Sequence, residues 1–149
     1  MVEAQYVVFS INEQIFGIEI SKIKEVLSYR KITPLPHVQG FVKGIINLRG
    51  MILPVFDLGK KFNFVRGDYS PYHVIIVMEI SGRVMGVIVD EITDVVEIFS
   101  EELQTTENLP TTLRRDYLNG VGKKNDEMII LLNIDRLLSP EELELADAT

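Results

Sequence analysis

Short apolar runs separated by turn-forming residues dominate the hydrophobic pattern of the chain. Most runs are no longer than an ordinary β-strand, and none has the length and period of a long amphipathic helix. The pattern predicts strands at residues 6–11, 14–20, 42–48, 51–56, 74–80, 84–89, 92–99, 117–121 and 128–133. Strands that recur at such short spacing indicate an all-β sandwich or barrel.

A few short helices are predicted beside these strands. Ser21 is a suitable N-cap for a short helix with Ile23, Val26 and Leu27 on its apolar face. Residues 139–142 read Ser-Pro-Glu-Glu, which places serine at the N-cap, proline at the first helical position and glutamate at the third. This order predicts a C-terminal helix.

The chain also resembles itself. When the sequence is moved along itself, one constant offset aligns Gly17 with Gly86, and a slightly larger offset aligns Gly44 with Gly120. We call these the first and the second offset. Each half would then form a unit of about five strands, which is too small to hold a complete core alone. We therefore expect a single domain, residues 1–149, made of two five-stranded subdomains that pack on a shared hydrophobic core.

The polar stretch at residues 65–71 is the predicted boundary between the subdomains, because it contains Gly67 and Pro71. This boundary is compatible with an N-terminal strand that pairs within the other subdomain.

The composition removes several kinds of chemistry. There is no cysteine, and the two histidines, His37 and His73, lie in different segments without a serine and a carboxylate in a recognisable order. Phosphate-loop, dinucleotide-binding and metalloprotease motifs are missing, and the acidic clusters lack the pattern of a calcium loop. We therefore expect no catalytic residue, no cofactor and no metal site.

The net charge of −7 disfavours binding to nucleic acid or to an anionic membrane. No apolar run approaches the length of a membrane span, and the first residues lack a positively charged leader region. The sequence therefore predicts a cytoplasmic protein without membrane insertion. The charge is uneven, at +4 for residues 1–66 and −11 for residues 67–149, which indicates that the halves present different surfaces.

The most distinctive run, residues 44–58, reads GIINLRGMILPVFDL, two apolar strands joined by a tight Arg49-Gly50 turn. This run resembles the signature of the CheW family, the chemotaxis coupling proteins. Four other segments follow in the family's order: VVFSINEQIFGIEISKIKEV, ITPLP, GVIVDEITDVV and YLNGVGKKNDEMIILLNIDRLL. The resemblance covers residues 5–145.

The resemblance implies two five-stranded SH3-like barrels packed on a shared core, with no enzymatic activity. It implies an adaptor that joins the signalling tips of methyl-accepting chemoreceptors to the regulatory domain of the histidine kinase CheA. Such an adaptor supports kinase activation and array assembly, and is recruited to receptor arrays at the membrane. The isolated chain is expected to be a monomer.

The resemblance also implies roles for individual residues. The positions that dock the kinase domain, expected to be partly exposed, are Val7, Ile20 and Ile23. The positions tied to receptor binding or coupling are Glu25, Arg49, Val74, Ile92 and Val95. Gly44 and Gly50 are expected to be structural turn residues. Burial in the core is the alternative for each apolar side chain, and Glu25 and Arg49 would pair if the two segments share a face.

A second class of function stays open, namely a small-molecule-binding β-barrel or a minor hydrolase that uses the cleft between the barrels. It would require a concave pocket with converging polar groups and perturbed ionisable residues. The sequence offers few such candidates.

Overall fold

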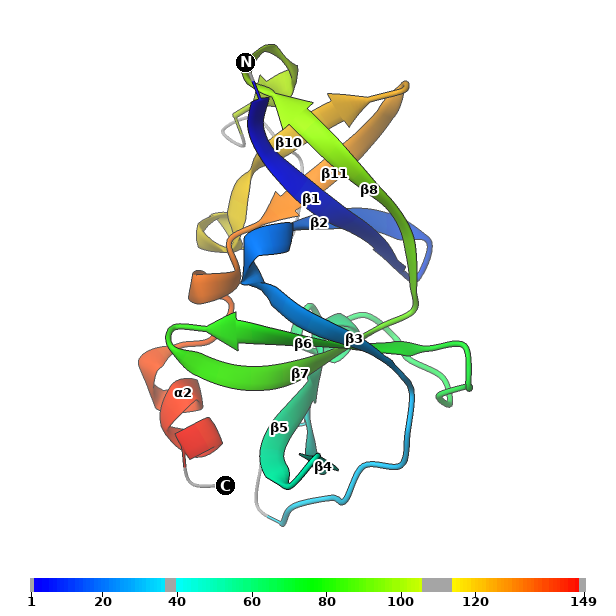
Figure 1. Cartoon of the computed structure of the whole chain (residues 1–149), viewed down its shortest axis with the longest axis vertical. Coiled ribbons are helices and arrows are strands. Elements are labelled where there is room, and N and C mark those ends of the chain that lie inside the picture. Colours follow the sequence, from blue (N-terminus) through cyan, green and yellow to red (C-terminus); the bar gives the residue numbers. More distant parts are fainter. Residues whose placement is uncertain (1, 37–39, 106–113, 148–149) are drawn as a thin grey trace.

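The strands form two sheets, each curled into a small barrel (Figure 1). The computed structural model describes residues 2–36, 40–105 and 114–147. The six-stranded barrel has the order β8 (Glu91–Phe99), β1 (Val2–Ile11), β2 (Gln14–Glu19), β11 (Glu127–Leu132), β10 (Leu118–Lys124) and β9 (Leu103–Gln104). The five-stranded barrel has the order β3 (Ile23–Ser28), β6 (Val74–Ile80), β7 (Arg83–Val89), β5 (Met51–Asp57) and β4 (Val42–Leu48).

This architecture confirms the all-β, two-barrel fold, with β9 as a short sixth strand at one edge. The helices are α1 (Leu58–Lys61), α2 (Pro140–Asp147) and the 3₁₀ turns η1 (Ile20–Lys22), η2 (Ser100–Glu102), η3 (Arg115–Tyr117) and η4 (Ile134–Arg136). Within the part of the chain that the structure describes, no helix has the length and apolarity needed to cross a membrane.

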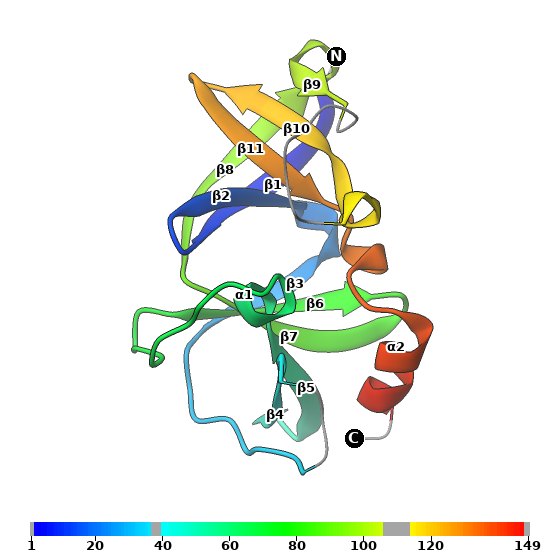
Figure 2. The same ribbon diagram turned by 180° about the vertical axis from the view of Figure 1, so that it is seen from behind.

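The two halves of the sequence exchange hairpins. The β1–β2 hairpin pairs with β8 and β11, and the β6–β7 hairpin pairs with β3 and β5 (Figures 1 and 2). The chain passes between the sheets at η1 and at Asp90. Residues 65–71 therefore do not separate the barrels, as the sequence had suggested, but connect α1 to β6 within the same barrel. Their polarity marks a long connection and not a change of sheet.

The internal repeat is visible in the strand register. Gly17 lies opposite Leu131 where β2 and β11 run parallel, and Gly86 lies opposite Val55 where β7 and β5 run parallel. The first offset relates Gly17 to Gly86, and the second relates Val55 to Leu131. A Cβ atom on Gly86 would lie 2.9 Å from Ile75 Cγ2 of β6 and 3.2 Å from Val55 Cγ2 of β5, so both neighbouring strands approach closely where glycine has no side chain.

The largest cluster of buried side chains lies between the barrels, which confirms the shared core. From the six-stranded barrel it includes Phe9, Ile11, Phe16, Ile18, Leu118 and Leu132, and from the five-stranded barrel Phe56, Ile76, Met78, Ile80, Met85, Val87 and Val89. Each barrel also has a smaller core of its own. The two barrels therefore depend on each other for the burial of their apolar faces.

One helix prediction was wrong and the other was right. Residues 23–28 form strand β3 and not a helix, because Val26 and Leu27 pair with Ile76 and Ile75 of β6. The C-terminal helix has the predicted capping box. The Ser139 amide donates to Glu142 Oε1 at 2.7 Å, and the Glu142 amide donates to Ser139 Oγ at 3.1 Å.

Candidate partner-binding surfaces

The predicted pairing of Glu25 with Arg49 is confirmed. Arg49 lies in the β4–β5 turn and donates through Nη1 and Nη2 to Glu25 Oε1 and Oε2, at 3.0 and 2.5 Å. Glu25 is on β3, and β3 and β4 are the two ends of the five-stranded sheet. The pair therefore bridges the gap where the barrel closes. The hydrogen bonds from Arg49 lower the pKa of the Glu25 carboxyl.

Exposed apolar side chains are next to this pair in sequence. Val26 is 48 % exposed, Met51 54 % and Ile52 49 %. The Arg49 side chain is itself 70 % exposed, whereas that of Glu25 is 31 % exposed. We call these residues, Glu25, Val26, Arg49, Met51 and Ile52, the bridge surface. It combines exposed apolar area with a partly exposed charge pair. Such a combination is typical of interaction surfaces.

The three predicted kinase-docking residues do not form one exposed edge. Ile20 is 41 % exposed in η1, as expected, and Ile23 is half-buried against the shared core. Val7 is only 6 % exposed, because β1 is flanked by β2 and β8 and Val7 pairs with Ile18 and Val95. The expectation that Val7 is exposed was therefore wrong.

The apolar residues that the resemblance tied to receptor binding fall into two groups. Val74 and Ile92 are half-buried against the shared core, whereas Val95 is 50 % exposed on β8. Gly50 lies in the β4–β5 turn with a φ of +88°, as expected. Gly44 is not in a turn. It lies within β4 at an irregularity in the pairing with β5 and has a φ of +141°.

The six-stranded barrel carries two exposed apolar side chains, Val95 and Met128, of which the sequence had indicated only Val95. The first offset of the internal repeat takes Val26 to Val95, and the second takes Ile52 to Met128. The exposed fractions of equivalent residues agree closely. They are 48 % for Val26 and 50 % for Val95, and 49 % for Ile52 and 48 % for Met128. Each barrel thus presents apolar side chains at equivalent places. The internal repeat is the signal that indicates Met128, because it relates this residue to Ile52.

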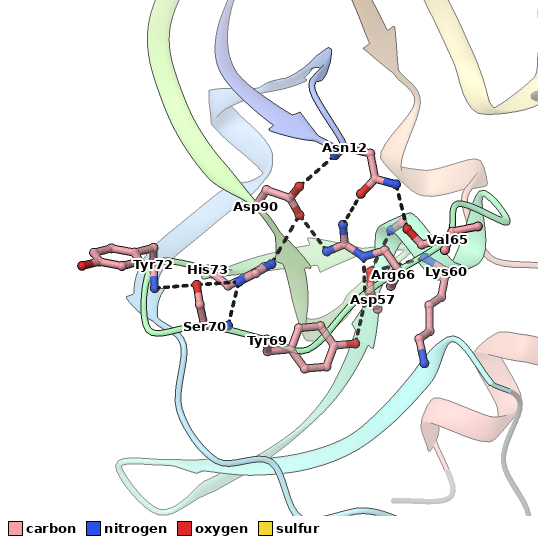
Figure 3. Close-up of polar contacts among 11 residues, drawn as sticks. Asn12, Asp57, Lys60, Val65, Arg66, Tyr69, Ser70, Tyr72, His73 and Asp90 are labelled. Carbon is pink, nitrogen blue, oxygen red and sulfur yellow. Dashed lines mark hydrogen bonds and ion pairs between the residues drawn. The ribbon is translucent and has the colours of Figure 1, made fainter.

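A buried polar cluster joins the two barrels (Figure 3). Asp57 is fully buried at the N-cap of α1 and accepts hydrogen bonds from the Gly59 amide at 2.8 Å and the Tyr69 hydroxyl at 2.5 Å. Arg66 Nε donates to Asp57 Oδ2 at 3.2 Å. Burial, and then the hydrogen bond to Asp57, raises the pKa of the Tyr69 hydroxyl. The tyrosine therefore stays a neutral donor.

Arg66 extends this cluster to the six-stranded barrel. Its Nη1 donates to Asn12 Oδ1 at 2.8 Å, and its Nη2 lies 2.7 Å from Asp90 Oδ1 (Figure 3). The sequence did not indicate this cluster, because Asn12 and Asp90 are far in sequence from Asp57, Arg66 and Tyr69, and nothing in the spacing indicates contact.

His73 has a serine and a carboxylate nearby, contrary to the sequence reading. Ser70 Oγ lies 3.1 Å from His73 Nδ1, and Asp90 Oδ1 lies 3.6 Å from His73 Nε2. The arrangement is not that of an activated nucleophile, however. His73 Nδ1 already accepts the Ser70 amide at 3.0 Å, and Ser70 Oγ accepts the Tyr72 amide at 3.2 Å. Asp90 is paired with Arg66 and lies too far from the ring to orient it.

Among residues 2–36, 40–105 and 114–147, no group of three or more metal-ligating side chains could hold a metal ion. His37 lies outside these described ranges.

The fold and these surfaces define a class: a protein of two SH3-like barrels whose exposed features suit protein–protein contact. A family model described as a CheW-like domain matches residues 5–142. The chain is 35 % identical to the chemotaxis protein CheW of Klebsiella aerogenes, covering 96 % of this chain and 86 % of that protein. It is 30 % identical to the chemotaxis protein CheW of Rhizobium meliloti, covering 95 % and 92 %.

The crystal structure of the scaffolding protein TtCheW from Thermoanaerobacter tengcongensis matches with a TM-score of 0.87 at 35 % identity. The match covers 95 % of this chain and 97 % of that one. The chain therefore belongs to the CheW family of chemotaxis coupling proteins.

Proposed function

We propose that this chain is a non-enzymatic adaptor that couples the signalling tips of methyl-accepting chemoreceptors to the regulatory domain of the histidine kinase CheA. In this role it works in the cytoplasm and is recruited to receptor arrays at the membrane. Relatives named as chemotaxis and scaffolding proteins support the proposal.

The bridge surface is the observation that carries the proposal. An exposed ion pair of the Glu25–Arg49 kind contributes little to folding, because water and salt screen it. Exposed Val26, Met51 and Ile52 contribute little to the core. When a partner covers this surface, apolar area is removed from water, and the charges can form desolvated contacts that discriminate between partners.

The two barrels give the adaptor two different faces on one body. The chain from residue 20 to residue 89, whose strands form the five-stranded barrel, carries ten Lys or Arg and four Asp or Glu, for a net charge of +6. The remaining residues carry a net charge of −13. Partners of opposite charge would therefore be steered to opposite barrels. Because the core is shared, a partner on one barrel is held at a fixed position relative to a partner on the other.

The proposal is tested by measuring the binding of the purified CheA regulatory domain and of a receptor signalling fragment. Val26→Asp should weaken binding of at least one of these partners by tenfold or more, with a melting temperature close to that of the parent. Gln14→Asp adds the same charge at an exposed polar position of β2 and should bind as the parent does. Failure of the parent chain to bind either partner would overturn the proposal.

A further inference from the structure

Each exchanged hairpin ends in a turn that is held by an aspartate. The Asn12 amide donates to Asp90 Oδ2, and the Ser81 amide donates to Asp135 Oδ1, both at 2.8 Å. The first offset of the internal repeat relates Asn12 to Ser81, and their φ angles are +49° and +50°. The two turns lie at opposite ends of the interface between the barrels (Figures 1 and 2).

The contacts around the first turn, which we call the Asn12 clasp and which Figure 3 draws, include a deeply buried charged side chain, although Asn12 itself is exposed. The Arg66 side chain is 4 % exposed and lies between Asp90 and the fully buried Asp57. Burial alone would lower the pKa of Arg66, but the hydrogen bonds and charges of the two carboxylates outweigh it and raise the pKa. Removing one member of such a buried group leaves an uncompensated charge, so the clasp resists opening.

The contacts around the second turn, which we call the Ser81 clasp, involve charged side chains that are more exposed than Arg66 and Asp90. Lys22 Nζ lies 3.0 Å from Asp135 Oδ2, and these side chains are 37 and 41 % exposed. Ser81 Oγ adds a long hydrogen bond of 3.2 Å to the Asp135 carbonyl. Cavities of about 300 and 390 Å³ border Ser81 and Asp135. Exposed ion pairs are weak and are screened by salt.

We propose that the interface between the barrels has one fixed end and one releasable end. In the releasable state the β6–β7 turn parts from Asp135 while the Asn12 clasp stays closed. The opening is local, because the shared core between the two clasps resists separation of the barrels.

The releasable end also lies beside two of the three predicted kinase-docking residues, Ile20 and Ile23, and this step rests on the proposed function. Lys22 lies two residues after Ile20 and directly before Ile23, so the segment that would dock the kinase domain also carries one member of the Ser81 clasp. A partner seated on Ile20 would therefore act directly on the open and closed populations of this clasp.

Amide hydrogen exchange of the full chain tests the inference without any partner. In the parent, the segment around Ser81 should exchange faster than the segment around Asn12. Raising the ionic strength from about 0.05 M to about 0.5 M should speed exchange at Ser81 by up to about fivefold. Exchange at Asn12 should change by much less. Equal exchange at the two turns, or an equal salt effect, would overturn the inference.

A matched pair of variants gives the second arm. Asp135→Asn keeps an acceptor oxygen but loses the charge, and should speed exchange at Ser81 about two- to fivefold with little change in melting temperature. Asp90→Asn should lower the melting temperature by several degrees, since it removes the charge paired with the buried Arg66. Glu127→Gln, at an exposed position of β11, should change neither quantity. An Asp135→Asn variant that matches the parent at Ser81 would overturn the inference.

These measurements separate the two hypotheses. A chain that binds neither partner but shows the unequal clasps would contradict only the proposed function. A chain that binds both partners with clasps of equal strength would contradict only the inference.

Discussion

At the scale of single residues, Gly44 requires glycine for a reason other than the turn that was predicted for it. The sequence identified Gly44 and Gly50 as turn glycines, and both have positive φ angles. A Cβ atom on Gly44 would lie 1.9 Å from the Thr33 carbonyl oxygen, whereas Gly50 has open space around it. The approach of Thr33 comes from its pairing with Ile45, a tertiary contact that no local pattern contains.

This difference predicts unequal effects of alanine at the two glycines. Gly50→Ala should cost about 1 kcal/mol of unfolding free energy, because only the positive φ is penalised. Gly44→Ala should cost several times more, since the methyl group also displaces the Thr33 backbone. Urea denaturation of both variants measures the two free energies. Equal losses would show that the approach of Thr33 is not what constrains Gly44.

The Glu25–Arg49 pair predicts a separation of stability from function. Arg49→Ala should leave the unfolding free energy nearly unchanged, because an exposed ion pair contributes little to folding. It should lose receptor coupling or kinase activation, because an interfacial charge left without its partner is costly once desolvated. The double variant Glu25→Arg, Arg49→Glu should recover part of the function that each single reversal loses. A double variant no better than the worse single would mean that each residue contacts a partner separately.

The burial of Val7 and the exposure of Ile20 make a matched comparison. Ile20→Asp should weaken binding of the kinase domain with little change in melting temperature, because the side chain is already 41 % exposed. Val7→Asp should be strongly destabilising, since it places a carboxylate at a position that is 6 % exposed. Thermal unfolding and a binding titration measure both effects. A large loss of stability in Ile20→Asp would show that Ile20 belongs to the core.

At the scale of elements, strands and caps differ in how well the sequence predicts them. The C-terminal helix was found because serine, proline and glutamate each act within one turn of the chain. Strand β3 was taken for a helix because Ile23, Val26 and Leu27 also fit a helical face. Pairing with β6 makes residues 23–28 a strand. This pairing is not visible in the local sequence, because β6 lies beyond β4, β5 and α1 in the chain.

The ion pair between α1 and α2 predicts a pH dependence. Lys61 Nζ lies 2.7 Å from Glu142 Oε2, and these side chains are only 10 and 11 % exposed. Burial opposes ionisation of Glu142, but the hydrogen bonds from Lys61 and Ser139 outweigh it and lower its pKa below the ordinary 4.5. A carboxyl group with a lowered folded-state pKa stabilises the fold at pH values above its ordinary pKa. This contribution disappears as the pH falls through the folded-state pKa.

Glu142→Gln should therefore be less stable than the parent near neutral pH, by about 1–3 kcal/mol. The difference should vanish in acid, once Glu142 of the parent is protonated. Urea denaturation of both chains from pH 7 down to pH 3 measures it. A stability difference that persists at the lowest pH would show that the carboxylate charge is not its cause.

At the scale of the whole molecule, the sequence predicted the repeat and the shared core but not the way the halves interlock. Residue spacing indicated the equivalence of β1–β2 with β6–β7, because glycines and turn residues recur at matched positions. It could not show that each hairpin joins the other half's sheet, since both arrangements satisfy the same local patterns. The exchange also sharpens the charge difference, from +4 and −11 for the halves to +6 and −13 for the barrels.

The exchange predicts that neither half of the chain can fold alone. A cut after residue 67 separates β1–β2 from β8 and β11, and separates β3 and β5 from β6–β7. Residues 1–67 and 68–149 should each be largely unfolded or aggregated, because every sheet then loses central strands and the shared core loses one side. Circular dichroism and denaturant titration of each fragment measure this.

The full chain should unfold in a single cooperative transition, because neither barrel can lose its strands without uncovering the core of the other. The two fragments, mixed in equal amounts, should regain native circular dichroism, since both barrels need strands from both. Two separate transitions in the full chain would contradict the shared core as the source of cooperativity. A fragment that folds cooperatively by itself would contradict the dependence of each barrel on the exchanged hairpin.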